Sequence, residues 1–273
     1  MPYSIILSDI DDTLLNDRLK VGKIDKKIIS ILERISFPFV LSSGRPTCSI
    51  LKIAKKIFTN FDSHYAISYN GAEVTSLKEN KTLFRVPLSI PQATQLAAIG
   101  SEYGITVQIY KENHFCISKK TKEAQSYYQK TGVPFKVIPT IFSNIDWEPS
   151  KIIFNAKHEL LEKVYPITSK LFKNQVNQVY SKPNYLEFFN KDVSKGVALQ
   201  FICNHLNIPI NESIAVGDSY NDIEMIKSAG LGLAVKNALP PVQEVAKLVL
   251  NATNNDNPLY EIVSRFVPEA LGK

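Results

Sequence analysis

Cysteine is scarce in this sequence: its 273 residues include only three, Cys48, Cys116 and Cys203. They lie far apart and form no C-x-x-C pair, which argues against a disulfide framework and against a zinc site. The sequence also has no run of 18 apolar residues, and no basic segment followed by a long apolar stretch at its start. These absences predict a cytoplasmic protein that has no membrane partner.

A concentrated basic stripe is also missing, although the formal net charge is +6 and the pI is about 9.0. Basic residues are scattered, with only short clusters such as Lys119-Lys120-Thr-Lys122. Proteins that bind nucleic acid gather such residues on one face, so we expect no nucleic-acid partner. A mild positive field suits small anionic substrates. The content of 44% hydrophobic and 21% charged residues predicts an ordinary globular chain and not a disordered one.

Short apolar runs that end in small or polar residues recur near both ends of the chain. Runs of this kind are typical of parallel strands that are buried on both faces. Helical spacing of apolar residues lies between them, for example over 24–35 and 196–206. The sequence therefore predicts an α/β fold with a doubly wound, Rossmann-like parallel sheet. The runs are Ile5–Leu7, Phe37–Leu41, Tyr65–Tyr69, Ile214–Val216, Leu231–Val235 and Lys247–Leu250.

The middle of the chain has a different pattern. Strand-like pairs separated by turn residues occur at 105–110 with 114–118 and at 177–181 with 185–189. A further strand is expected over 151–156, and helices near 91–103, 120–131 and 158–173. We therefore expect a core made of residues 1–82 and 190–273. An α+β cap domain of residues 83–189 is expected to be inserted into it.

Carboxylates follow two of the predicted core strands. Asp9 and Asp11 end the first strand, and residues two apart in an extended chain share a face. Asp218 directly follows another strand, and Asp222 comes four residues later. The carboxyl ends of parallel strands form the edge where ligands bind. Four carboxylates at one edge would repel each other without a cation, and carboxylate oxygens suit Mg²⁺.

Groups that could hold a phosphate are expected at the same edge. Ser43 and Gly44 end the second strand and offer a hydroxyl and a backbone N–H. Lys195 starts a predicted helix and brings an ammonium group, and Asn221 adds a side-chain amide. Phosphoryl transfer depends on such positioning and charge stabilisation, together with a nucleophile and an acid/base.

Four short motifs, in order, resemble those of haloacid dehalogenase-superfamily phosphatases. They also resemble the Cof-type group of that superfamily, in which a large α/β cap lies between the second and third motifs. A further stretch, Asn70-Gly71-Ala72, is similar to one that these proteins carry at the entry to the cap. The motifs are Asp9-Ile-Asp11-Asp-Thr13, Leu41-Ser-Ser43-Gly44-Arg45, Val193-Ser-Lys195-Gly and Gly217-Asp218-Ser-Tyr-Asn221-Asp222.

The resemblance implies a role for each of these residues. Asp9 attacks the substrate phosphorus to form an aspartyl-phosphate, and Asp11 protonates the leaving oxygen and then activates water. It also implies that Mg²⁺ binds the Asp9 carboxylate, the Asp11 carbonyl and Asp218, with Asp222 orienting the surroundings. The groups implied to hold the phosphate oxygens are Ser43, the Gly44 N–H, Lys195, Asn221 and the N–H groups of Ile10 and Asp11.

Several assignments stay open at this point. Ser42 competes with Ser43, although the register with Gly44 favours Ser43, and Arg45 is expected either to contact substrate or to form an ion pair. Thr13 is expected to bond the turn and fix Asp11, and Asp12 and Asp17 are expected to be solvated or to cap. Asn254 and Asp256 receive no role, because their loop departs from the family pattern. Aromatic candidates for a leaving-group pocket, most of them expected in the cap's own core, are Tyr127, Tyr128, Tyr180, Tyr185 and Phe188.

The leading hypothesis is a Mg²⁺-dependent phosphatase of a small phosphorylated metabolite, such as a sugar phosphate. One alternative is a phosphomutase that uses the same aspartyl chemistry, and another is a phosphometabolite-binding regulator without turnover. We expect a monomer or weak dimer.

Overall fold

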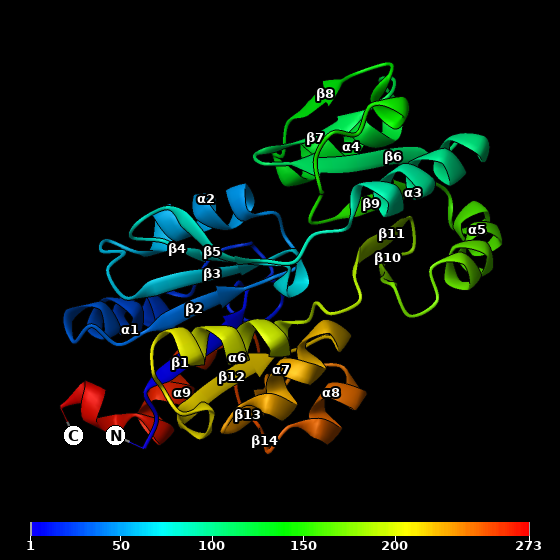
Figure 1. Ribbon diagram of the computed structural model, residues 1–273. Coiled ribbons are helices and arrows are strands. Elements are labelled where there is room, and N and C mark those ends of the chain that lie inside the picture. Colours follow the sequence, from blue (N-terminus) through cyan, green and yellow to red (C-terminus); the bar gives the residue numbers. More distant parts are fainter. Residues whose placement is uncertain (1, 273) are drawn as a thin grey trace. The chain divides into compact units, whose positions relative to one another are not determined.

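The computed structural model describes residues 2–272, which divide into two compact units. The core unit comprises residues 2–45, 50–84 and 194–272, and the inserted unit comprises residues 46–49 and 85–193. The sequence pattern predicts an insertion of residues 83–189. Figure 1 shows both units with their helices and strands labelled.

The core unit is built on an eight-stranded sheet with the order β14-β13-β12-β1-β2-β3-β4-β5. The six strands from β14 to β3 are parallel, and each of them overlaps one of the apolar runs. The antiparallel strand β4 and its neighbour β5, at the other edge, were not predicted. The strands are β1 (Ile5–Asp9), β2 (Phe39–Ser42), β3 (His64–Ser68), β4 (Glu73–Ser76), β5 (Lys81–Arg85), β12 (Ser213–Gly217), β13 (Leu231–Ala234) and β14 (Leu248–Val249).

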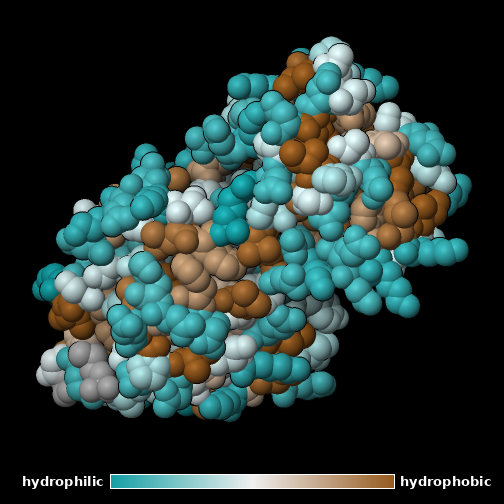
Figure 2. All heavy atoms as spheres, viewed as in Figure 1, coloured by the Kyte–Doolittle hydropathy of each residue, from teal (hydrophilic) through white to brown (hydrophobic). Residues whose placement is uncertain are grey.

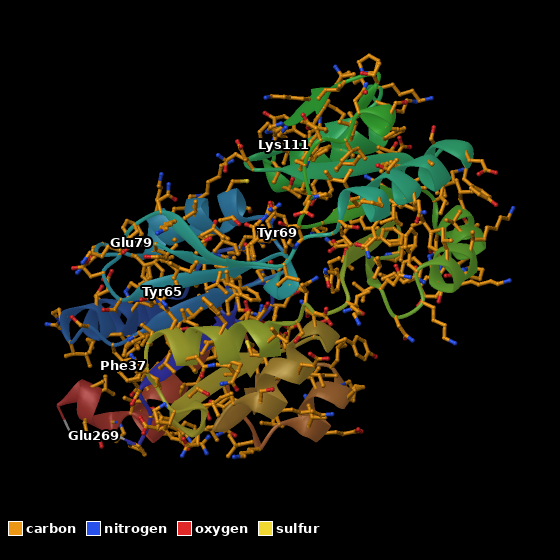
Figure 3. All side chains as sticks on the ribbon, in the orientation of Figure 1. Phe37, Tyr65, Tyr69, Glu79, Lys111 and Glu269 are labelled. Carbon is orange, nitrogen blue, oxygen red and sulfur yellow. The ribbon has the colours of Figure 1, made fainter. Side chains whose placement is uncertain are left out.

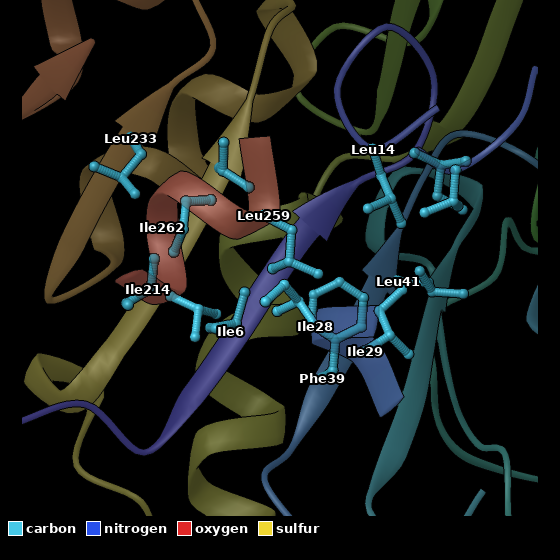
Figure 4. Close-up of a cluster of buried hydrophobic side chains, with 14 of the residues drawn as sticks. Ile6, Leu14, Ile28, Ile29, Phe39, Leu41, Ile214, Leu233, Leu259 and Ile262 are labelled. Carbon is cyan, nitrogen blue, oxygen red and sulfur yellow. The ribbon is translucent and has the colours of Figure 1, made fainter. Parts of the chain in front are cut away.

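Helices cover both faces of this sheet. On one face, Ile6 and Ile214 pack with Ile28 of α1 and with Leu259 and Ile262 of α9 (Figure 4). On the other face, the side chains of α6 and α7 pack against Ile5, Leu7 and their neighbours. The predicted doubly wound α/β class is therefore confirmed. The α-helices are α1 (Lys23–Arg34), α2 (Thr47–Ile57), α6 (Lys195–His205), α7 (Ile223–Ser228), α8 (Pro240–Val245) and α9 (Pro258–Phe266).

The inserted unit is an α+β structure around a six-stranded sheet, with the order β10-β11-β9-β6-β7-β8. Side chains of α3 and α5 form an apolar cluster with one face of this sheet. The two predicted strand pairs are present as the antiparallel pairs β6–β7 and β10–β11. The elements are α3 (Ile90–Glu102), β6 (Thr106–Lys111), β7 (His114–Ile117), α4 (Lys122–Thr131), β8 (Phe135–Val137), β9 (Ile152–Asn155), α5 (His158–Leu171), β10 (Val176–Lys182) and β11 (Tyr185–Asn190).

The face of the molecule drawn in Figure 2 is largely polar. Figure 2 shows hydrophilic residues over most of the visible face, with hydrophobic residues in smaller groups among them. Within residues 2–272, no helix is long and apolar enough to cross a bilayer.

Helices α1 and α9 cap each other's N-termini, although more than 220 residues separate them in the chain. The Asn257 side chain, from the residue that precedes α9, accepts a hydrogen bond from the Ile24 N–H in the first turn of α1. In return, the Asp25 carboxylate accepts hydrogen bonds from the N–H groups of Leu259 and Tyr260. Unpaired N–H groups at helix starts need such acceptors. The two exchanges therefore fix α9 against α1.

Asp25 gives the core unit a pH-dependent stability. Burial raises its pKa to about 6, although the N–H groups of Tyr260 and Leu259 lower it. Because this value lies above that of an unfolded aspartate, about 4, the folded state binds the proton more tightly. Its stabilising contribution is complete below pH 4 and is lost as pH rises through 6. Between pH 5 and pH 8, we expect the free energy of unfolding of the wild type to fall by about 1–1.5 kcal/mol relative to that of Asp25→Asn.

Urea unfolding of both proteins at the two pH values measures this difference. The exposed carboxylate of Asp192 provides a matched control, because Asp192→Asn should follow the wild type at both pH values. A constant stability difference between wild type and Asp25→Asn across this range would contradict the assignment.

Candidate active site

The candidate site lies where three parallel strands of the core unit end. Asp9 closes β1 and is in register with Ser42, the last residue of β2. Asp218 directly follows Gly217, which closes β12 on the other side of β1. This is the edge at which open α/β sheets bind ligands. The strand order thus brings together carboxylates that lie about two hundred residues apart in the chain.

Three carboxylates and one ammonium group form the centre of this edge. Oxygens of Asp9, Asp218 and Asp222 lie within 4.8 Å of one another. The Lys195 ammonium is completely buried; its Nζ lies 2.5 Å from Asp9 Oδ1 and 2.6 Å from Asp222 Oδ1. Lys195 is the first residue of α6, which begins after Ser194 caps it by accepting the Val197 N–H. The centre therefore contains one basic side chain and three acidic ones.

The pKa values follow from this crowding. Burial raises the pKa of Asp9 well above its usual value, while the Lys195 ammonium works in the opposite direction. Burial, and then the charge of Asp222, raise the pKa of Asp218 to about 6. Burial alone would lower the pKa of Lys195, but the carboxylates of Asp222 and Asp9 outweigh it and hold that pKa above its usual value. The cluster carries surplus negative charge, and its carboxylate oxygens fit a hard divalent cation.

Asp222 is already engaged by the protein through both oxygens. Its Oδ1 accepts from Lys195, and its Oδ2 accepts from the backbone N–H groups of Asp218 and Ser219 at 3.1 Å. Gly217 leaves room for this arrangement, because a Cβ there would lie 2.4 Å from the Asp222 side chain. Asp222 therefore holds the loop and the lysine in place.

Thr13 corrects one expectation. It was expected to hydrogen-bond the turn and fix Asp11, but its Oγ1 donates to Asp218 Oδ1 at 2.8 Å. The reason is that Thr13 is fully buried in the turn that follows β1, and the neighbouring strand β12 leads directly into Asp218. Thr13 therefore orients Asp218, which follows the neighbouring strand β12.

Asp11 is held by Arg45 in a bidentate ion pair. Arg45 Nε donates to Asp11 Oδ2 at 2.7 Å, and Nη2 donates to Oδ1 at 2.6 Å. Both side chains are partly exposed. Of the two roles that the sequence left open for Arg45, the ion pair is present. Two parallel N–H···O bonds fix the orientation of a carboxylate better than one, so the Asp11 side chain has a defined direction.

The expected phosphate-holding residues lie on neighbouring loops. Ser43 is buried, and its Oγ accepts the Arg45 N–H at 3.1 Å. A Cβ on Gly44 would lie 2.7 Å from Asn70 Oδ1, so the glycine leaves room for the Asn70 side chain. Asn221 is exposed, and its Nδ2 donates to the same Asn70 oxygen at 2.9 Å. The sequence motifs imply no role for the Asn70 side chain, although an Asn-Gly pair after an apolar run signals a left-handed turn.

Other acidic and polar residues near this edge serve the loops. Asp12 is exposed, and its carbonyl accepts the Asn237 side-chain amide. The side chain of Asn254, which had no assigned role, donates to the Leu15 carbonyl and to Asp17 Oδ1. Asp256 accepts from the N–H and hydroxyl groups of Thr253. The Asn254 bonds tie the last loop to the segment after β1, and the Asp256 bonds hold the last loop itself.

The aromatic candidates divide by burial. Tyr127, Tyr185 and Phe188 are buried within the inserted unit, as expected for most of the group. Tyr128 is exposed, and Tyr180 stacks on Tyr165 with ring centroids 5.6 Å apart. Packing within the inserted unit therefore accounts for most of them.

The fold and this edge define an α/β enzyme with a buried carboxylate–lysine centre. The family profile of haloacid dehalogenase-like hydrolases matches residues 6–263. The chain therefore belongs to this family and is a hydrolase, which confirms the resemblance seen in the motifs.

Similar proteins span nearly the whole chain. A candidate phosphatase of Buchnera aphidicola subsp. Acyrthosiphon pisum is 31% identical over 262 residues, which is 93% of this chain and 93% of that protein. A Thermotoga maritima protein of known crystal structure has 30% sequence identity to this chain. Its structure gives a TM-score of 0.89, and the match covers 97% of both chains. A haloacid dehalogenase-like hydrolase from Bacteroides thetaiotaomicron has a TM-score of 0.90 and 23% identity, covering 96% of this chain and 99% of its own.

Proposed function

We propose that this hydrolase is a Mg²⁺-dependent phosphatase of a small phosphorylated metabolite, such as a sugar phosphate, and that it acts through an aspartyl-phosphate on Asp9. The observation that carries the proposal is the buried Asp9 carboxylate, held by Lys195 beside Asp218 where the parallel strands end. Phosphoryl transfer relies on positioning and charge stabilisation, and this centre offers both.

The proposed reaction has two steps. In the first, an Asp9 oxygen forms a bond to phosphorus while the bond from phosphorus to the leaving oxygen breaks, and Asp11 gives that oxygen a proton. In the second, Asp11 takes a proton from water, which attacks the same phosphorus and releases Asp9 and inorganic phosphate. Lys195 supports Asp9 through its bond to Oδ1, and Arg45 fixes the direction of Asp11.

The carboxylates of Asp9 and Asp218, with the backbone carbonyl of Asp11, are the proposed Mg²⁺ ligands. Asp222 keeps a supporting role, because its oxygens already accept three protein hydrogen bonds. A bound Mg²⁺ would offset negative charge on the phosphoryl group. Thr13 serves the same site by orienting Asp218.

Donors on the surrounding loops complete the proposed phosphate site. They are the Ser43 hydroxyl, the N–H groups of Gly44 and Ile10, the Asn221 amide and the Lys195 ammonium. We propose that the inserted unit selects the leaving group as a cap domain. The enzyme is further proposed to be a cytoplasmic monomer or weak dimer.

Removal of the metal tests the proposal. Phosphate release from a panel of phosphomonoesters should fall at least about 100-fold in excess chelator, because offsetting transition-state charge is worth several kcal/mol, and should return when Mg²⁺ is restored. Full activity in chelator would contradict the proposed metal site. Turnover that needs a bisphosphate activator would indicate the phosphomutase instead. Tight binding of phosphometabolites without any release would indicate the regulator.

A further inference from the structure

The turn after β3 has an unusual backbone. Tyr69, Asn70 and Gly71 have φ angles of 53°, 59° and 105°, so three consecutive residues lie in the left-handed region. Asparagine and glycine tolerate that region, whereas a bulky residue such as Tyr69 does not. Such residues cost about 1–3 kcal/mol each, and the surrounding structure must hold them in place. Figure 3 labels Tyr69 at this end of β3.

Backbone contacts join this turn to the loop after β2. The Asn70 N–H donates to the Ser43 carbonyl at 3.1 Å, and the Tyr69 N–H donates to the Arg45 carbonyl at 3.0 Å. The Asn70 side chain is only 6% exposed and lies directly against Gly44. These contacts fix residues 69–71 to the loop that carries Ser43 and Gly44. The same loop packs against the Asn70 side chain and limits its position.

Contacts with two further loops complete the arrangement. A Cβ on Gly71 would lie 2.1 Å from the carbonyl oxygen of Ser194, the residue before Lys195. Asn70 Oδ1 accepts the hydrogen bond from Asn221 Nδ2. The turn therefore contacts all the loops that carry the proposed phosphate donors apart from the one after β1. The Asn70 side chain is thus hydrogen-bonded directly to a proposed phosphate donor, Asn221.

We propose that Asn70 is a positioning residue that holds the Asn221 amide in the orientation in which its other N–H meets a phosphate oxygen. The inference rests on the phosphatase function proposed above. Asn221 is exposed, and without this bond its amide would have to be ordered when the ligand binds. A neutral acceptor suits the place, because a carboxylate there would repel the phosphate.

A double-mutant cycle tests this coupling. Asn70→Gly keeps the left-handed backbone and the N–H bond to Ser43, and removes the acceptor oxygen. Asn70→Gly and Asn221→Ala should each weaken competitive inhibition by inorganic phosphate about 3- to 10-fold, as expected for one hydrogen bond. The double variant should stay within about twofold of Asn221→Ala, because Asn70 acts through Asn221. If the double variant instead weakened phosphate inhibition by the product of the two single effects, the inference would be overturned.

A conservative variant separates positioning from general structural support. Asn70→Asp keeps an acceptor for Asn221 and tolerates the left-handed backbone. In the Asn70→Asp background, Asn221→Ala should therefore still cost about 3- to 10-fold, even though the added charge weakens phosphate binding by itself. This measurement can be made even if Asn70→Gly does not fold. If Asn221→Ala no longer weakened phosphate inhibition in the Asn70→Asp background, the inference would be overturned.

Asn80 offers a matched control, because it is an exposed asparagine with a φ of 49°. It lies between β4 and β5, and β4 runs antiparallel to β3. Asn80 is therefore at the end of the strands opposite to the candidate active site. Asn80→Gly should leave phosphate inhibition unchanged, and an equal effect there would count against a specific role for Asn70. A wild type that neither releases phosphate nor responds to it would instead refute the proposed phosphatase function. If the wild type releases phosphate but the effects of Asn70→Gly and Asn221→Ala multiply in the double variant, only the inference about Asn70 is refuted.

Discussion

An Asp9→Asn variant should release phosphate at least about 1,000-fold more slowly than the wild type, because an amide cannot act as the nucleophile. Asparagine has the size of aspartate, and its carbonyl oxygen can still accept from Lys195, which is 2.5 Å away. The fold should therefore persist. Phosphate release under saturating substrate and Mg²⁺, together with the melting temperature, measures both effects.

The matched control for this variant lies three residues further along the chain. Asp12 is exposed and has a left-handed φ of 59°, which asparagine adopts readily. Asp12→Asn should keep activity within about twofold of the wild type, as is usual for surface substitutions. Unchanged phosphate release in Asp9→Asn would remove the nucleophile from the proposed mechanism, whatever the control shows.

Lys195→Met should lower both stability and activity. The wild-type ammonium is completely buried and offsets Asp9 and Asp222, and methionine fills a similar volume without the charge. Breaking a buried ion pair from one side costs about 3–5 kcal/mol, because the remaining charges are uncompensated. Urea unfolding in chelator should show this loss, and phosphate release should fall at least about 100-fold, because the proposed lysine donor to the phosphoryl group is gone.

Lys227 provides the comparison for this lysine. It is exposed in the last turn of α7, so Lys227→Met should change the free energy of unfolding by no more than about 0.5 kcal/mol. Wild-type stability and activity in Lys195→Met would mean that the lysine neither offsets the carboxylates nor assists the reaction.

The sequence predicted the core strands because two-face burial leaves a direct signature. Ile5–Leu7 and Ile214–Val216 are continuous apolar runs, and they became the neighbouring strands β1 and β12. Strands β4 and β5 were missed because they lack this signature. Residues Lys81–Arg85 of β5 form an edge strand that mixes charged and apolar side chains, and residues Glu73–Ser76 of β4 include only one large apolar side chain, so neither shows a continuous apolar run.

The meeting of Asp9 with Asp218 was predictable, because both follow buried parallel strands and such ends share one edge. Individual side-chain partners were not. Whether Arg45 pairs with Asp11, and whether Thr13 reaches Asp218, depends on rotamers and loop angles that no periodicity encodes. The place of Asn70 depends likewise on a three-residue left-handed turn, of which the sequence shows only the Asn-Gly pair.

The position of β1 in the middle of the core sheet has a consequence for folding during synthesis. Its neighbour β2 is made within about the next thirty residues, but its other neighbour, β12, begins only at Ser213. Until the ribosome has passed that point, one edge of the strand that carries Asp9 lacks its native partner. Such long-range pairing is slow, because a large loop must close first. The inserted unit, whose strands all lie between residues 106 and 190, can therefore fold before the candidate active site is assembled.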